Sequence, residues 1–288
     1  MGHGDHARTP WASVPCVTSS YAWRIAEGSA ERAGIEIVEL TTPESQADAR
    51  AVFDVVWPAE DGATQVRPNL LRALVHAGGY CVAAYDSSSR DLLGATLAFL
   101  GRAEGGTLML HSHMSAVIDA ARNRHIGTAM KQHQRAWAGV HDIPVVSWTF
   151  DPLVRRNAFV NLVKLGIEVR GYHENFYGEM NDAINAGDPS DRLVAWWPVD
   201  SDRTRLAAEG ELTPLSDEAA RARSDVRIVA TPEDIVTLRA TDPIAARQWR
   251  LDVREQLQRS FADGWVIDGI TDEGSYVLRP STVEGESL

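Results

Sequence analysis

Hydrophobic and polar positions alternate in several short stretches of the chain, a period of two residues that is typical of strands with one buried face. In the first part of the chain these stretches are 35–40, 80–85, 92–100 and 107–117. The polar segment 86–91 predicts a hairpin loop between the second and the third. Two stretches with helical spacing follow the first strand, each with a proline near its start, and they end near Val56 and His76.

The second half of the chain continues this mixture of helices and strands. Apolar residues recur at helical spacing from Ile126 to Val140, and a further helix is predicted from Pro152, capped by Asp151, to Gly166. Apolar strands are predicted at 145–150, 167–177 and 192–199. The resulting order, β-α-α-β-β-β-α-β-α-β-β, predicts an α+β fold with a mixed α/β sheet.

The segments outside this pattern have their own composition. Residues 1–34 are predicted to form a polar tail and one short helix over 20–33. The main domain would then span 35–200, followed by a charged, alanine-rich linker at 201–225. Residues 226–288 are predicted as a β-α-β-β extension whose helix lies around 243–262.

The overall charge limits what the chain is expected to bind. With 28 basic and 40 acidic residues among 288, the formal net charge is −12, so neither nucleic acid nor an anionic membrane surface is an expected partner. The apolar runs are too short to cross a bilayer, and residues 1–34 lack a signal-peptide hydrophobic segment, so a soluble cytoplasmic protein is expected. Cys16 and Cys81 alone give no disulfide framework.

One local charge pattern departs from this acidic background. The segment from Ala120 to His141 contains four basic residues, Arg122, Arg124, Lys131 and Arg135, and no carboxylate. This segment is also where a predicted strand passes through a short loop into a predicted helix. The first N–H groups of such a helix are unpaired and point one way, which favours a phosphate site.

The loop itself resembles a known motif. Arg122-x-x-His-x-Gly127-x-Ala129 resembles the pyrophosphate-binding loop of the GNAT superfamily of acyl-CoA-dependent N-acyltransferases, whose usual pattern is Arg/Gln-x-x-Gly-x-Gly/Ala. His125 stands where the first glycine is usual, and a literal match, Arg124-x-x-Gly127-x-Ala129, begins two residues later.

Further motifs at close spacing resemble one bacterial branch of this superfamily, which includes D-amino-acid N-succinyltransferases. They are Trp148–Leu153, Arg156–Ala158, Asn161–Gly166, Tyr172–Gly178 and Asp191–Leu193. The resemblance is strong over about 35–200 and loose over 225–280. The extension would then be an incomplete second GNAT lobe, because its Thr-Pro-Glu-Asp turn echoes the opening Thr-Pro-Glu-Ser. An α/β cap with ordinary turn chemistry explains the same match equally well.

The resemblance implies a binding site for acetyl-CoA or succinyl-CoA as acyl donor, with no metal. The implied pyrophosphate site consists of the loop and the end of the strand before it: Val117, Arg122, Arg124, His125, Ile126, Gly127, Thr128 and Ala129. Asn157 would meet the pantetheine arm or serve as a local helix cap. Arg155 or Arg156 would meet a CoA phosphate or an acyl carboxylate; adjacent helix positions diverge, so we expect only one to do so.

Candidate catalytic residues lie on two predicted strands. His111 and His113 share one face and allow three readings: a general base with its partner, a metal pair, or buried polar residues. A metal pair has the least support, because no third ligand has suitable spacing. Tyr177 lies on a predicted strand that borders the acceptor side in the family, so the resemblance implies either a catalytic role or a packing or surface role for it. Leu162 stands where many family members carry the tyrosine that protonates the leaving thiolate.

The predicted function is transfer of an acetyl or succinyl group from CoA to a small-molecule amine, most plausibly an amino acid. Two alternatives remain: an acyl-CoA-binding module without catalysis, and a GNAT-like enzyme with another acyl-CoA reaction, such as decarboxylation or hydrolysis. The sequence is compatible with a homodimer and does not fix the number of subunits.

Overall fold

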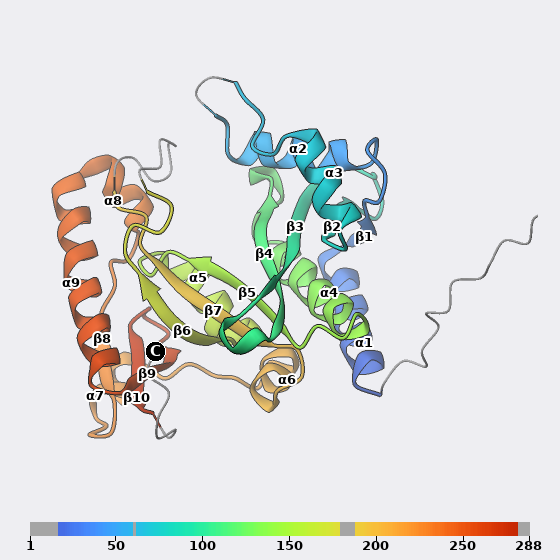
Figure 1. The fold of residues 1–288 in the computed structure, drawn as a ribbon. Helices are drawn as coiled ribbons and strands as arrows, with labels where there is room; N and C mark the ends of the chain where they lie inside the picture. The colour runs from blue at the N-terminus through green and yellow to red at the C-terminus, as the bar shows by residue number, and fades with distance from the viewer. Residues whose placement is uncertain (1–16, 60–61, 179–187, 282–288) are drawn as a thin grey trace, which may run out of the picture.

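The computed structural model of the protein describes residues 17–59, 62–178 and 188–281 (Figure 1). A mixed sheet of seven strands forms its centre, in the order β1-β2-β3-β4-β5-β7-β6. Its strands are β1 (Ile35–Glu39), β2 (Tyr80–Asp86), β3 (Leu92–Arg102), β4 (Leu108–Val117), β5 (Val145–Phe150), β6 (Glu168–His173) and β7 (Arg192–Pro198). All neighbours are antiparallel except β4 and β5. The predicted element order and the α+β fold class are confirmed.

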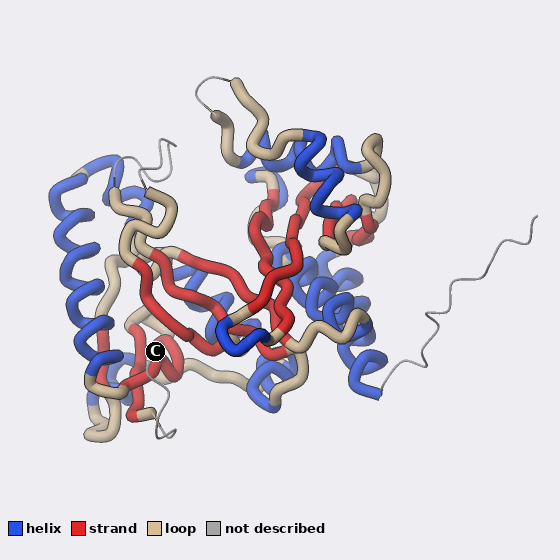
Figure 2. Tube along the Cα trace, in the orientation of Figure 1, coloured by secondary structure: helices blue, strands red, loops and turns tan. Residues whose placement is uncertain are grey.

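Helices cover both faces of the sheet (Figures 1 and 2). Helices α2 (Gln46–Val56) and α3 (Pro68–His76) pack against one face through a core that includes Phe53, Leu71 and Leu97. Helices α1 (Val17–Ala33) and α4 (Ile126–Val140) lie together on the other face. Helix α5 (Arg155–Phe159) continues into a π-helical turn, η3 (Val160–Leu165), which shares a core with α4. Its end at Gly166, where φ is 68°, matches the predicted helix end.

The two parallel strands at the centre of the sheet separate towards their C-terminal ends. Strands β4 and β5 pair only at Met109–Val145, Leu110–Val146 and His111–Ser147, although both continue beyond that point. A β-bulge lies where they separate, because consecutive residues of β3 pair with Met114 and Ser112 and leave His113 as the extra residue. A bulge bends its strand and increases the local twist, which turns β4 away from β5.

Two predicted helix starts differ from the structure. Helix α2 begins at Gln46, because Thr42 and Ser45 exchange side-chain and backbone hydrogen bonds and hold the preceding residues in a turn. Helix α5 begins at Arg155, and Asp151 does not cap it. The Asp151 carboxylate accepts a hydrogen bond from the backbone N–H of Leu153 at 2.9 Å and otherwise serves an ion-pair network with the C-terminal region.

The C-terminal region forms a second, three-stranded sheet in the order β8-β10-β9. Its elements are β8 (Arg227–Val229), α8 (Ile235–Thr241), α9 (Pro243–Ala262), β9 (Trp265–Ile270) and β10 (Tyr276–Pro280). The predicted β-α-β-β extension is present, but its strand order differs from that of the opening half, because β1, β2 and β3 pair in sequence order whereas here the last strand lies in the middle. This order matches that of β5, β7 and β6 instead. The shared Thr-Pro-Glu motif starts a helix or turn and carries no information about strand order.

The predicted linker contains two helices, α6 (Asp202–Glu209) and α7 (Asp217–Arg221), capped by the hydroxyls of Ser201 and Ser216. One hydrophobic core runs from the central sheet into the extension, since Trp148 and Leu193 belong to the same buried cluster as Val253. The predicted boundary at 225 is therefore not a boundary in packing.

A buried ion network joins the extension to the end of β5. Arg250 on α9 donates to Asp151 at 2.8 and 2.9 Å and to Asp188 at 2.8 Å. Arg239 on α8 donates to the same two carboxylates at 2.6 and 3.0 Å. Burial alone would raise the pKa of Asp151, but the two guanidinium groups hold it below the ordinary value. These ion pairs thus fix the extension to the end of β5, the strand that separates from β4.

Candidate functional site

The loop between β4 and α4 leaves the start of α4 uncapped. Its N-cap residue, His125, has φ of 61° and ψ of 13°, and no side chain caps the helix. The first intrahelical bond at this end runs from the N–H of Ala129 to the carbonyl of His125, so the N–H groups of the preceding turn point outward. Glycine adopts this left-handed conformation most readily, which explains the usual glycine at the position of His125.

The space above this loop is open. Apart from its chain neighbours and the backbone of its own helix, a Cβ atom built on Gly127 would meet no heavy atom of the described residues within 4 Å. Arg122 is exposed and pairs with Asp119 at 2.7 Å, a surface contact of little strength. The basic side chain and the outward N–H groups together form a site that suits a phosphate.

Arg124 has a different position from the one the motif implies. Its guanidinium donates to Asp86 at 2.8 Å and to the carbonyl of Ala33 at 3.3 Å. This contact, with two backbone N–H groups, lowers the pKa of Asp86 to about 2. The side chain of Arg124 therefore ties the loop to the β2–β3 hairpin and to the end of α1, and its role at a ligand stays a prediction.

The opening between β4 and β5 lies next to this loop. We define it as the region bordered by residues 112–117 of β4 and 148–150 of β5, which are not paired with each other in the described structure. The remaining edges are paired, since Val117 faces Gly94 of β3 and Trp148 faces Ala195 of β7. An extended polar arm entering here can make main-chain hydrogen bonds with the free strand edges, as an added strand does.

The two histidines lie together beside Phe99 of β3. Their ring centroids are 6.1 Å apart, and the Phe99 ring is 5.1 Å from His111 and 5.7 Å from His113. The shared face predicted for them is confirmed. Burial, with smaller contributions from His113 and Lys131, lowers the pKa of His111 to about 4. Burial also lowers the pKa of His113. Both rings are therefore neutral at pH 7, and His111 is a weak base.

Tyr177 reaches the border of the opening from the segment after β6. Its hydroxyl lies 3.1 Å from the hydroxyl of Thr149 on β5. Alternation along β5 places Thr149 on the face opposite to Trp148. Tyr172 is engaged elsewhere, because its hydroxyl donates to the buried carboxylate of Asp191 at 2.5 Å. Burial and this carboxylate raise its pKa far above the ordinary value.

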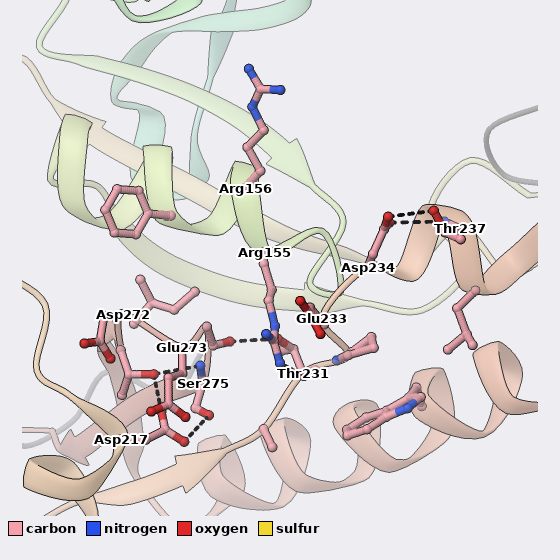
Figure 3. Close-up of a pocket in the computed structure, with 18 of the residues that line it drawn as sticks. Arg155, Arg156, Asp217, Thr231, Glu233, Asp234, Thr237, Asp272, Glu273 and Ser275 are labelled. Atoms are coloured by element: carbon pink, nitrogen blue, oxygen red, sulfur yellow. Dashed lines mark hydrogen bonds between the residues drawn. The ribbon is translucent and has the colours of Figure 1, made fainter. Parts of the chain in front are cut away.

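Helix α5 presents its two arginines in opposite directions (Figure 3). Arg155 donates to the hydroxyl of Thr231 at 3.0 Å and to the Thr231 carbonyl, inside a pocket of about 1110 Å³ formed with the extension. Arg156 also borders this pocket, but its exposed side chain points the opposite way from that of Arg155. Arg155 is therefore engaged by the extension, and a contact of Arg156 with a ligand stays a prediction. Asn157 is exposed and does not cap α5, whose N-cap is Val154, so the local-cap reading is wrong.

The pocket in Figure 3 does not coincide with the opening in the central sheet. Two of its acidic groups bond neighbouring polar groups: Asp217 accepts from Thr271 and Ser275, and Asp234 accepts from Thr237. We take the opening between β4 and β5 as the candidate site, because unpaired strand edges and an uncapped helix start meet there.

Sequence reasoning missed one residue at this site. Lys131, taken as part of a basic helix start, is 9% exposed. Its ammonium donates to the Ser112 hydroxyl at 2.8 Å and to Gln134 at 3.3 Å, and lies 3.7 Å from the centre of the Trp148 ring. A lysine between the apolar positions 129, 130 and 137 of an amphipathic helix was the available signal.

Leu162, at the position of the expected tyrosine, is 1% exposed and belongs to the core. Among the described residues, no group of three or more histidine, cysteine, aspartate or glutamate side chains could hold a metal ion. In the same part of the chain, no helix is both long and apolar enough to span a membrane.

No protein-family model matches the chain, and no curated protein sequence does. Among solved structures, the chain is similar to a GNAT-family acetyltransferase from Streptococcus pneumoniae, with 15% identity over 57% of this chain and 99% of that chain and a TM-score of 0.44.

A GNAT-family acetyltransferase from Elizabethkingia anophelis with acetyl-CoA bound has 15% identity over 57% of this chain and 98% of that chain, with a TM-score of 0.40. An N-acetyltransferase from Staphylococcus aureus has 13% identity over 57% and 97%, with a TM-score of 0.41. With such low identities and TM-scores, the function of this chain has to follow from the geometry of its own residues.

Proposed function

We propose that this chain is an N-acyltransferase of the GNAT type, which transfers an acetyl or succinyl group from CoA to a small amine, namely an amino acid. One observation supports this most directly: the opening between β4 and β5 lies beside the uncapped start of α4. CoA combines a pyrophosphate with an extended arm of two amides that ends in a sulfur. A helix start suits the first, and free strand edges suit the second.

Different residues around the opening would bind different parts of the donor. Arg122 and the N–H groups at the start of α4 would hold the pyrophosphate, and Val117 lies where the unpaired edge of β4 ends. Asn157 and Arg156, exposed at the start of α5, would contact the arm or an acyl carboxylate. A free carboxylate on the acyl group, as in succinyl-CoA, would give Arg156 a charged partner.

The reaction needs a proton acceptor for the attacking amine, and three residues on the acceptor side are available. His111 and His113 flank Phe99, and Tyr177 reaches β5 through Thr149. His113 suits the task better than His111, because burial makes His111 a weak base.

A second candidate function is binding of an acyl-CoA without catalysis. The buried Leu162 and the low pKa of His111 favour it, since both remove proton-transfer capacity from positions where the reaction needs it. A hydrolase or decarboxylase acting on an acyl-CoA is the third reading and needs no amine.

One experiment separates these functions. Acetyl-CoA and succinyl-CoA are each incubated with D- and L-amino acids, and the products are read by mass together with the release of free thiol. We expect a mass increase of the acyl group on an amine and thiol release that depends on it. Thiol release without an amine would support hydrolysis, and a mass loss of carbon dioxide from the donor would support decarboxylation. Calorimetric binding of CoA with no product would support the binding module.

A further inference from the structure

Lys131 occupies the point where the two central strands part. His111 and Ser147 form the last pair between β4 and β5. The next residue is Ser112 on β4 and Trp148 on β5. The Lys131 ammonium contacts both of these residues, at 2.8 Å from the Ser112 hydroxyl and 3.7 Å from the centre of the Trp148 ring. A charged group from α4 thus reaches the narrow end of the opening.

The chemistry of acyl transfer requires a proton donor at such a place. When an amine displaces a thiol from a thioester, the carbon–nitrogen bond forms, the carbon–sulfur bond breaks, and the sulfur leaves with an electron pair. A thiolate that leaves without a proton is a poor leaving group in a water-excluded site. The inference rests on the function proposed above, because it assumes that a thioester occupies the opening.

We propose that Lys131 is the general acid that protonates the departing sulfur. In this step the Lys131 ammonium transfers a proton to the sulfur, which leaves as a thiol, and Lys131 is left as a neutral amine. The acceptor amine loses its own proton to a base on the other face or to water. Lys131 then regains a proton from solvent before the next turnover.

The environment of Lys131 matches this task. Burial lowers the pKa of its ammonium to about 7, whereas an unperturbed thiol has a pKa of about 8.5. Proton transfer from this ammonium to a thiolate is therefore downhill, while an ordinary lysine near 10.4 would make it uphill. The Trp148 ring contacts the ammonium and favours the charged form, which keeps part of the population ready to donate.

The charged groups around Lys131 leave this proton mobile. Within the described residues no carboxylate forms an ion pair with it, and its hydrogen-bond partners, Ser112 and Gln134, are neutral. The titratable or charged neighbours are His111 on β4 and Arg135, one turn further along α4. A carboxylate partner would have raised the pKa of the lysine. Without such a partner among the described residues, burial keeps this pKa near 7.

The first test locates the proton without any turnover. Lys131 and Lys164 are the only lysines of the sequence, so a protein labelled with ¹³C at the lysine ε-carbon gives two resonances, and Lys164→Met assigns them. Lys131 should titrate with a midpoint near 7. A midpoint above about 9 for Lys131 would overturn the proposal, since the transfer would then be uphill.

The second test asks whether the sulfur lies beside the lysine. CoA and desulfo-CoA, which lacks only the sulfur, are added to the same labelled protein. CoA should move the Lys131 midpoint by about one pH unit or more, because a thiol or thiolate would couple to it, and desulfo-CoA should not. If both ligands bind by calorimetry and neither changes the Lys131 resonance, the proposal fails while the proposed binding function stands. If neither ligand binds, the proposed function itself fails.

Variants test the chemical step with the donor and amine found in the screen. Lys131→Met cannot donate a proton, and Lys131→Arg keeps the charge but is a very weak acid. Both should lower kcat by about 10²–10⁴-fold and leave the Kd for CoA within roughly threefold; Lys164→Met should change neither. The wild-type rate should fall as pH rises through the Lys131 midpoint, and Lys131→Met should lose that alkaline limb. A Lys131→Arg enzyme with near wild-type kcat would show that charge alone suffices and would overturn proton donation.

Discussion

His111 on β4 and Ser147 on β5 form the last pair between the two parallel strands, and the sheet opens immediately after them. The bulge residue His113 lies two positions further along β4. The same pair therefore marks the end of the paired part of these two strands, and Lys131 on α4 contacts the residue that follows each member of the pair.

The loop before α4 should carry much of the affinity for CoA. Arg122→Ala removes a charge. Gly127→Val adds bulk on a side of the helix where no other part of the described structure lies within 4 Å, so its effect should fall on a ligand. We expect the double variant to weaken CoA binding by about 1.5–3 kcal/mol, measured by calorimetry.

Arg259→Ala is the matched control for this loss of charge. Its guanidinium pairs with Glu255 on the exposed side of α9, and CoA affinity should not change. An unchanged affinity in the loop variant, with the fold intact by circular dichroism, would remove the loop from the site.

His113 is expected to matter more for the rate than His111. A general base contributes about 10²–10⁴-fold, and its pKa should lie near the working pH. His113→Ala should lower kcat by that factor, while His111, with a pKa of about 4, should contribute less. The acid limb of the rate profile, recorded from pH 4 to 9, should disappear in His113→Ala. If both variants keep the wild-type limb, Tyr177 becomes the better candidate, and Tyr177→Phe tests it.

The ion network should hold the extension on the central sheet. Asp151→Asn leaves Arg250, which is fully buried, with only one of its two carboxylate partners, and breaking a buried pair in this way costs about 3–5 kcal/mol. Urea unfolding at pH 7 measures this cost. Asp225→Asn is the control, because its partner Arg223 is on the surface, and it should leave stability unchanged. Equal effects of the two variants would contradict a structural role for the network.

The network also predicts a dependence on acid. The folded-state pKa of Asp151 is lower than its unfolded value, so its contribution is fully present above pH 4. As the pH falls below that value the unfolded chain takes up the proton first, and the contribution is lost. Asp151→Asn should therefore show a smaller decrease in stability between pH 5 and 3 than the wild type.

Lys131 predicts a dependence in the alkaline range. Its folded-state pKa is about 7 and its unfolded value about 10.4, so between these values the unfolded chain binds one more proton. Stability should then rise with pH, by on the order of 2–3 kcal/mol from pH 7 to 9. Lys131→Met should lack this rise and should be at least as stable as the wild type at pH 7. Parallel stability curves for the two proteins would show that Lys131 stays charged.

The sequence by itself determined the order and type of the elements, because strand alternation, helix spacing and the turn residues at their ends are local properties. It also indicated the loop at Arg122 and Gly127, where composition and motif coincide. The helix from Pro243 to Ala262 and the helix from Pro68 to His76 begin and end close to the prediction for the same reason.

Tertiary structure decided where charged side chains are directed. Arg124 and Arg155 are basic residues in segments where a phosphate ligand is expected. In the folded chain, Arg124 donates to Asp86 and Arg155 donates to Thr231, and both partners are far away in sequence. Burial of Lys131 depends on the strands that α4 packs against, and the lowered pKa follows from that burial. Strand order in the extension likewise depends on pairing between distant segments, which no local pattern encodes.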